Sequence, residues 1–243
     1  MNSITTIQPP PFVERFQYKA CKQINDPVTR KRCYQTPDGE SLPSVTTILS
    51  ATKDMTHLNE WKNRIGHDKA AQITKEASGV GTAMHGNLER FLCGLERQPG
   101  NNPVHIQANK MADVIIENGL SNMQEVWAME QSLYFPGLYS GTTDLIGVHE
   151  GDPAVCDHKQ TNKPKKAEWV EDYYLQLMAY ILAHNEVYKT DIRKGVIFMC
   201  SRDFQYQQFT LEPKDFNKYQ DLWLAKVEEY YTLGLQGYKQ LLA

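Results

Sequence analysis

Residues 126–159 contain three strand-like segments in a row, and this block constrains the fold more than any other part of the chain. Apolar residues dominate each segment, and Pro136-Gly137 and Gly151-Asp152-Pro153 supply tight turns between them. Turns this short fold successive strands side by side. We therefore expect the centre of a β-sheet to be built from Val126–Tyr134, Tyr139–Val148 and Ala154–Lys159.

Helical patterns flank this block on both sides. Apolar residues recur at helical spacing before and after it. The expected helices are Ser44 (as cap) to Leu49, Leu58–Ile73, a segment capped by Thr82 after breaks at Gly79 and Gly81, His105–Glu117, Glu168–Tyr188 and Pro213–Leu233. A hairpin is expected from Gly195–Cys200 and Gln205–Leu211, and a tight turn between two short strands at Thr36-Pro37-Asp38-Gly39.

This order of elements predicts an α/β (α+β) fold, with a mixed central sheet of about five strands flanked by helices. The chain has 243 residues and shows no clear internal boundary. We expect one domain over 1–243. An N-terminal helical layer would cover about 43–120, and the sheet core with its closing helices about 121–243.

Composition excludes several classes of protein. No apolar run approaches the ~18 residues that a membrane span needs. Residues 1–12 lack both the apolar core of a secretory leader and the arginines of a transit peptide, so a cytoplasmic protein is expected. Five scattered cysteines without a C-x-x-C pair indicate free thiols rather than structural zinc. The net charge of −3 neither indicates nor excludes nucleic-acid binding, because a local basic patch can accompany an acidic metal site.

The segment Asp157-His158-Lys159 is the strongest candidate for chemistry. Residues two apart in a strand share a face, so Asp157 and Lys159 would project together while the His158 side chain points away. An acid-x-lysine pattern occurs three times in the chain, but only this one follows an apolar strand start. A carboxylate that holds Mg²⁺ or Mn²⁺ beside a lysine that orients water is suited to hydrolysis of a phosphodiester.

Asp144 is the candidate second carboxylate. It lies thirteen residues before Asp157, on the preceding expected strand, and Leu145 and Ile146 follow it. Neighbouring strands are ~4.8 Å apart, so the two acids would reach a common metal ion. The alternative is an ordinary surface aspartate at a strand end.

Other polar residues align with this pair. Gln176 and Tyr180 are four residues apart on one helix, as are His85 and Glu89 on another, and Glu130 is a charge within an apolar strand. Each of these alone is more often ordinary surface. A basic run also follows Lys159, which is either a solvated loop or a phosphate-binding segment, and it comprises Lys163, Lys165 and Lys166.

Five motifs in a fixed order carry a family resemblance. They are Gly81-Thr82-x-x-His85-x-x-x-Glu89, Glu130, Gly141-x-x-Asp144, Asp157-x-Lys159 and Gln176-x-x-x-Tyr180. In this order and spacing they resemble the RecB-like branch of the PD-(D/E)XK nucleases. Leu42-Pro43-Ser44-Val45-Thr46-Thr47-Ile48-Leu49 followed by Leu58-x-x-Trp61 is similar, more narrowly, to the mitochondrial genome maintenance exonucleases and their phage relatives. The resemblance runs from about Pro43 to Tyr180.

The resemblance implies a role for each matched residue. His85, Asp144, Asp157 and the backbone carbonyl of His158 would bind Mg²⁺ or Mn²⁺, and Lys159 would position the attacking water. Gln176 and Tyr180 would orient Lys159 or the scissile phosphate. Glu89 and Glu130 would be supporting acidic groups around the ligands. Asp157 stands where many relatives have glutamate, which leaves the distance to the metal open.

The resemblance also implies a substrate, namely single-stranded DNA entered from a free end, in recombination, repair, replication or phage genome processing. Leu58–Asn118 would form an arch that an end must thread. Lys163, Lys165 and Lys166 would contact phosphates. Trp61, Trp127 and Trp169 either stack bases or serve packing. Some relatives carry an iron–sulfur cluster, which is not expected here because no cysteine follows Cys200.

Three alternatives remain at this stage. An endonuclease of the same fold would use the same residues, and a non-catalytic nucleic-acid-binding module would keep the fold without the chemistry. The motif match could also be fortuitous in an unrelated α/β enzyme. The location would be the host cytoplasm for a phage protein. The sequence indicates neither the oligomeric state nor the polarity of digestion.

Overall fold

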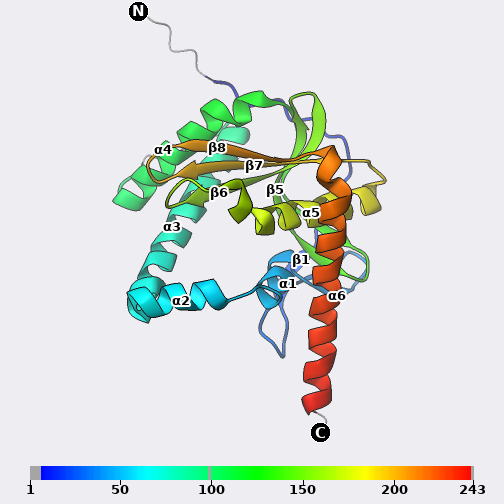
Figure 1. The fold of residues 1–243 in the computed structure, drawn as a ribbon. Helices are drawn as coiled ribbons and strands as arrows, with labels where there is room; N and C mark the ends of the chain where they lie inside the picture. The colour runs from blue at the N-terminus through cyan, green and yellow to red at the C-terminus, as the bar shows by residue number, and fades with distance from the viewer. Residues whose placement is uncertain (1–6, 98–99, 242–243) are drawn as a thin grey trace, which may run out of the picture.

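The computed structural model describes residues 7–97 and 100–241, with side chains up to residue 234. Within these ranges it is a mixed α/β structure with six α-helices, a five-stranded sheet and a small three-stranded sheet (Figure 1). The large sheet has the order β4-β5-β6-β7-β8, in which only β6 and β7 pair in parallel. Its strands are β4 (Met123–Phe135), β5 (Tyr139–His149), β6 (Asp152–Thr161), β7 (Lys194–Ser201) and β8 (Tyr206–Leu211).

Helices cover both faces of the large sheet, so the strands are buried on two sides. Alternate residues along a strand belong to different cores, as Val155 and Cys156 do on β6. One core contains α1 (Val45–Ala51), α5 (Glu171–Tyr188) and α6 (Phe216–Leu241). The other contains α3 (His67–Leu92) and α4 (Pro103–Asn118). In Figure 1, α4 and α5 lie on opposite sides of the sheet.

The small sheet packs near the start of β5. It consists of β1 (Lys22–Asn25), β2 (Arg32–Gln35) and β3 (Ser41–Pro43), all antiparallel. The expected turn at Thr36–Gly39 joins β2 to β3, whereas β1 was not predicted. Ser44 caps α1 through a hydrogen bond from the Thr47 N–H, as expected, and forms a bridge to Ser140 of β5.

The predicted break before Thr82 is wrong. A single helix, α3, runs through Gly79 and Gly81 from His67 to Leu92. A glycine costs a helix only about 1 kcal/mol, and burial of this half of α3 against α4 and the sheet outweighs that cost. The chain breaks instead at Gly66, whose φ of 89° ends α2 (Thr56–Ile65).

The expected N-terminal helical layer is not one layer. α1 and α4 pack on opposite faces of the sheet. Of these helices, α2 and the start of α3 stand furthest from both cores, and they form an arch that ends at α1 (Figure 1). No residue of α2 is buried, which agrees with an element outside both cores. Among the helices described, none is long and apolar enough to cross a membrane.

Candidate active site

The large sheet opens at the point where the candidate residues meet. The ladder between β5 and β6 runs from His149 paired with Asp152 to Leu145 paired with Cys156 and goes no further. Beyond this point β6 continues beside β7 alone. Asp144 and Asp157 are the next residue on each strand. Their side chains therefore lie at a gap in the sheet that can be reached from both helical layers.

Asp157 and Lys159 form a buried ion pair on the face that α5 covers. Lys159 Nζ lies 2.5 Å from Asp157 Oδ2, and the two side chains are 21% and 3% exposed. Burial raises the pKa of Asp157, although the Lys159 ammonium opposes this. Burial by itself lowers the pKa of Lys159, but the carboxylates of Asp157 and Asp144 raise it above its ordinary value. Lys159 is therefore held as a positively charged donor.

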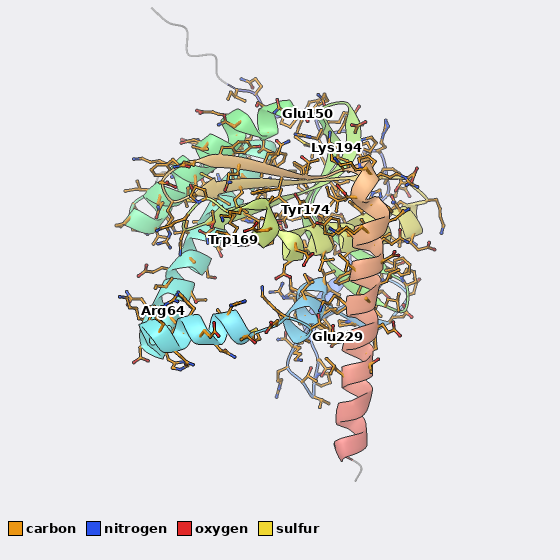
Figure 2. The ribbon with its side chains drawn as sticks, viewed as in Figure 1. Arg64, Glu150, Trp169, Tyr174, Lys194 and Glu229 are labelled. Carbon is orange, nitrogen blue, oxygen red and sulfur yellow. The ribbon has the colours of Figure 1, made fainter. Side chains whose placement is uncertain are left out.

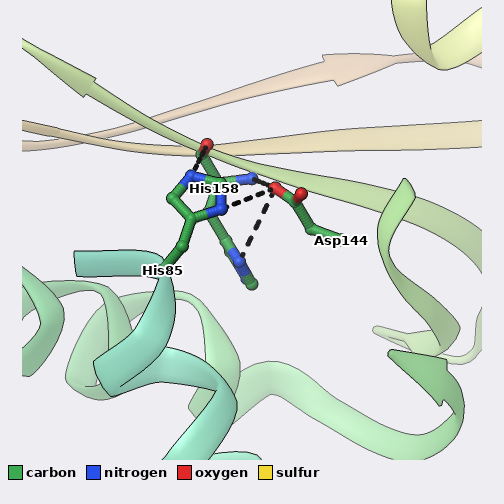
Figure 3. Close-up of side chains that lie close together, drawn as sticks. All are labelled: His85, Asp144 and His158. Atoms are coloured by element: carbon green, nitrogen blue, oxygen red, sulfur yellow. Dashed lines mark hydrogen bonds and ion pairs between the residues drawn. The ribbon is translucent and has the colours of Figure 1, made fainter. Parts of the chain in front are cut away.

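His85, Asp144 and His158 gather on the other side of the gap (Figure 3). Asp144 Oδ2 accepts a 2.7 Å hydrogen bond from the His158 backbone N–H and lies 3.6 Å from His85 Nδ1. His85 Nε2 is 2.9 Å from the His158 carbonyl oxygen. One nitrogen or oxygen atom from each of the three side chains lies within 4.8 Å of the others. These atoms can serve as ligands for a divalent cation.

The His158 side chain lies closer to this cluster than expected. As predicted, it points to the face of the strand opposite to Asp157 and Lys159, where its ring stacks on Phe198. Its Nδ1 nevertheless lies 3.8 Å from Asp144 Oδ2, because the Asp144 carboxylate occupies the gap between the strands. Burial lowers the pKa of His158 to about 3, so the ring is neutral and one of its nitrogens is available as a ligand.

A cavity of about 210 Å³, roughly seven water molecules by volume, opens beside Asp144 and the Asp157–Lys159 pair. Glu130, Asp144, Asp157, Lys159, Gln176 and Tyr180 all line it. Gln176 donates to the Tyr180 hydroxyl at 3.3 Å, and Tyr180 is buried. The cavity therefore brings together six of the residues that the sequence singled out, from β4, β5, β6 and α5, whereas His85 and His158 do not line it.

Gly141 allows Tyr180 to reach this cavity. A Cβ at Gly141 would lie 2.9 Å from Tyr180 Cε1 and 3.2 Å from its hydroxyl. We expect Gly141→Ala to destabilise the fold by about 1–3 kcal/mol through overpacking. The check is the free energy of unfolding in urea.

Gly81 is the matched control, because it belongs to another of the five motifs but has room. A Cβ there meets only Gln160 Cγ, at 3.5 Å. Gly81→Ala should be neutral or should stabilise the helix by about 0.5–1 kcal/mol. A Gly141→Ala protein as stable as wild type would contradict the close approach of Tyr180.

Glu130 and Glu89 influence the cavity by charge. Glu130 falls at the register position opposite Asp144, yet the β4–β5 ladder skips it, and its φ of 45° is left-handed. Such a conformation costs a residue with a side chain about 1–3 kcal/mol. Partial loss of solvent and repulsion from Asp144 raise the pKa of Glu130 to about 7, and Glu89 adds to the repulsion. Glu89 itself is exposed on α3 and does not line the cavity.

The basic run lies beside the cavity but does not line it. Lys163 and Lys166 are exposed, and Lys166 lies 3.7 Å from Glu168. Lys165 is partly buried, and its backbone exchanges two hydrogen bonds with the Gln207 side chain. These hydrogen bonds hold the loop in place, and its lysines precede the N-terminal end of α5.

The three tryptophans differ in what they can contact. Trp127 is buried and donates to Glu125, so it is a packing residue. Trp61 is half-buried on α2, and Trp169 is 57% exposed just before α5 (Figure 2). Only the latter two present ring surface to solvent.

Tyr173 is a site residue that the sequence analysis missed. Lys159 Nζ lies 5.3 Å from the centre of its ring, and Lys165 Nζ lies 6.0 Å from it. It precedes Gln176 by three positions and Tyr180 by seven, so helical spacing could have revealed it. The cavity is also lined by four residues that belong to none of the five motifs, namely Arg32, Tyr34, Ser44 and Thr46.

Comparisons with known proteins identify no family. No family model and no curated protein matches the chain. Among solved structures, that of SSO0001 is similar with a TM-score of 0.37 and 15% sequence identity, over 72% of this chain and 69% of that chain. A likeness of this extent leaves the site itself as the basis for assigning a function.

Proposed function

We propose that this protein is a metal-dependent deoxyribonuclease of the PD-(D/E)XK type, in its RecB-like exonuclease branch. It would hydrolyse phosphodiester bonds of single-stranded DNA from free ends. The observation that supports this best is the convergence of Asp144, Asp157 and Lys159 on one cavity at a gap in the sheet. Two carboxylates and a fixed ammonium are what metal-assisted attack on a phosphate requires.

The donor set fits a divalent cation. His85, Asp144, Asp157 and the His158 carbonyl would hold it, and the nearby His158 ring offers a further nitrogen. Carboxylate and carbonyl oxygens suit Mg²⁺ and Mn²⁺, and the imidazoles favour Mn²⁺ of the two. When bound, the ion would lower the pKa of water and offset charge on the phosphate oxygens.

The protein side chains would orient the reactants. Lys159 is a charged donor whose position Asp157 fixes, so it can hold a water molecule against phosphorus and stabilise the charge that develops on a non-bridging oxygen. Gln176 and Tyr180 form a hydrogen-bonded pair in the same cavity and would position the phosphate. Glu130 and Glu89 would tune the charge around the ligands.

Shape supports a single strand with a free end as the substrate. The cavity at the reacting groups has a volume of about 210 Å³, which is small enough to admit a phosphate but not a stretch of duplex. The arch of α2 and the start of α3 projects from the rest of the fold. It continues into α1 at one end and into the buried half of α3 at the other (Figure 1). A strand that passes beneath it would have to be threaded from an end. Lys163, Lys165 and Lys166 would contact its phosphates, and Trp61 and Trp169 its bases.

The test compares end-labelled linear single-stranded DNA with a closed circle of the same sequence, in Mg²⁺, in Mn²⁺ and in EDTA. We expect shortening of the linear strand only, and none in EDTA. Cutting of the circle would indicate an endonuclease of the same fold. No metal-dependent cutting of single strands, duplex DNA or RNA would indicate a non-catalytic binding module and would end the proposal.

A further inference from the structure

One part of the cavity wall belongs to the small sheet and the start of α1. Arg32, Tyr34, Ser44 and Thr46 form this wall. Tyr34 ties it to β5, because its hydroxyl lies 3.1 Å from that of Thr142, two residues from Asp144. Arg32 is two residues from Tyr34 on β2 and so projects from the same face of that strand. The wall thus places an arginine at the rim of an acidic cavity.

The backbone of Arg32 is held by hydrogen bonds, whereas its guanidinium has no ion-pair or hydrogen-bond partner among the described residues. Its carbonyl accepts hydrogen bonds from the Ser44 N–H at 3.1 Å and the Thr47 hydroxyl at 2.9 Å, which lock β2 onto the start of α1. Its side chain is exposed. Within residues 7–97 and 100–234, its guanidinium takes part in none of the ion pairs, side-chain hydrogen bonds or cation–π contacts. Lys159, the other cation of the cavity, is already paired with Asp157.

Arg32 also lines a second hollow beside the cavity. Arg32 and Thr46 line both the cavity and an adjoining hollow of about 490 Å³. Lys31, Thr47 and Ser50 line the second hollow as well, and it contains no carboxylate. Arg32 thus lies on the boundary between an acidic cavity and a hollow that is lined by hydroxyl groups and a lysine.

We propose that this boundary is a backbone-binding subsite, in which Arg32 binds the phosphate next to the one that is cleaved. The ligand is a phosphodiester group of the same single strand, one nucleotide away from the bond in the cavity. Thr46 and Lys31 would lie along the strand beyond this group. The inference rests on the proposed nuclease function and adds to it a residue that fixes the register of the strand. A guanidinium suits this task because its fork can donate two hydrogen bonds to one phosphate.

The test measures binding of a short fluorescein-labelled single-stranded oligonucleotide by anisotropy, over a series of salt concentrations, with Ca²⁺ in place of Mg²⁺. Each phosphate contact on a single strand contributes about 0.7 to the slope of log affinity against log salt. We expect Arg32→Ala to reduce that slope by about 0.7 and to weaken binding about 10-fold. Arg32→Lys should keep the slope, because it keeps the charge, while losing part of the affinity.

Arg30→Ala is the matched control, since Arg30 is exposed on the same hairpin and lines none of these hollows. It should leave slope and affinity unchanged. A second series uses oligonucleotides that each carry one neutral methylphosphonate. One position, adjacent to the cleaved bond, should weaken binding to wild type and have no further effect on Arg32→Ala.

The outcomes separate the two proposals. Metal-dependent cleavage by wild type, with Arg32→Ala indistinguishable from Arg30→Ala, would overturn the subsite and leave the nuclease intact. A loss spread evenly over all phosphate positions would also overturn the subsite, since it would reveal only a diffuse charge effect. Absence of both binding and cleavage in wild type would remove the proposed function and the subsite with it.

Discussion

Lys159→Ala is expected to slow cleavage of single-stranded DNA about 10²–10⁴-fold, the range that a positioned proton-transfer or water-orienting group contributes. The reason is geometric, because Lys159 is the one ammonium that lines the cavity beside Asp157, at 2.5 Å. DNA affinity should change little, since most of it comes from phosphates bound outside the cavity. The measurement is single-turnover cleavage of end-labelled DNA, together with anisotropy for binding.

The variant removes the counter-charge of a buried carboxylate, so its fold must be checked. Burial already raises the pKa of Asp157, and protonation of that group would limit the loss of stability. Lys214→Ala is the matched control, because Lys214 is an exposed lysine that lines neither the cavity nor the adjoining hollow, and it should cleave at near the wild-type rate. A folded Lys159→Ala protein with wild-type rates would remove Lys159 from the mechanism.

Asp157→Asn should weaken the affinity for Mn²⁺ by about 100-fold or more, since loss even of a group that only supports a metal ligand costs 10–100-fold. The amide keeps the shape of the side chain but loses the charge that a divalent cation needs. Titration calorimetry with Mn²⁺ measures the affinity directly and without DNA. Cleavage should fall in parallel and should recover partly at high Mn²⁺ concentration.

This substitution also leaves Lys159 without its ion-pair partner. Breaking a fully buried pair costs roughly 3–5 kcal/mol, and the cost here should be smaller because 21% of the Lys159 side chain is exposed. Thermal unfolding in EDTA separates this loss from the loss of metal binding. Unchanged Mn²⁺ affinity in a folded Asp157→Asn protein would contradict the assignment of Asp157 as a ligand.

The sheet was predictable from local patterns because its signals are local. Alternating apolar residues and two short turns define β4, β5 and β6 to within a few residues, and the final hairpin and helix follow in the predicted order. The continuity of α3 through Gly79 and Gly81 was not predictable, because burial against α4 decides it. β1 and Tyr173 were missed, the latter despite sharing helical spacing with Gln176 and Tyr180.

The assembly of the site needed information that no local pattern contains. His85 meets the carbonyl of His158 across 73 positions, and only the family resemblance suggested that they belong together. The pairing of Asp157 with Lys159 followed from strand geometry alone. Arg32 was not considered, because nothing in the sequence around it shows that β2 docks beside Asp144.

The gap between β5 and β6 links two parts of the molecule that otherwise have separate hydrophobic cores. His85 comes from the α3 layer, while Asp157 faces the α5 layer on the opposite side of the sheet. An ion bound by both residues would link the two helical layers through the sheet. Because it would bind only the folded protein, its binding free energy would add to the stability of both layers together. Unfolding should then become more cooperative as Mn²⁺ is added, and the proposed metal site would also stabilise the packing of the two layers.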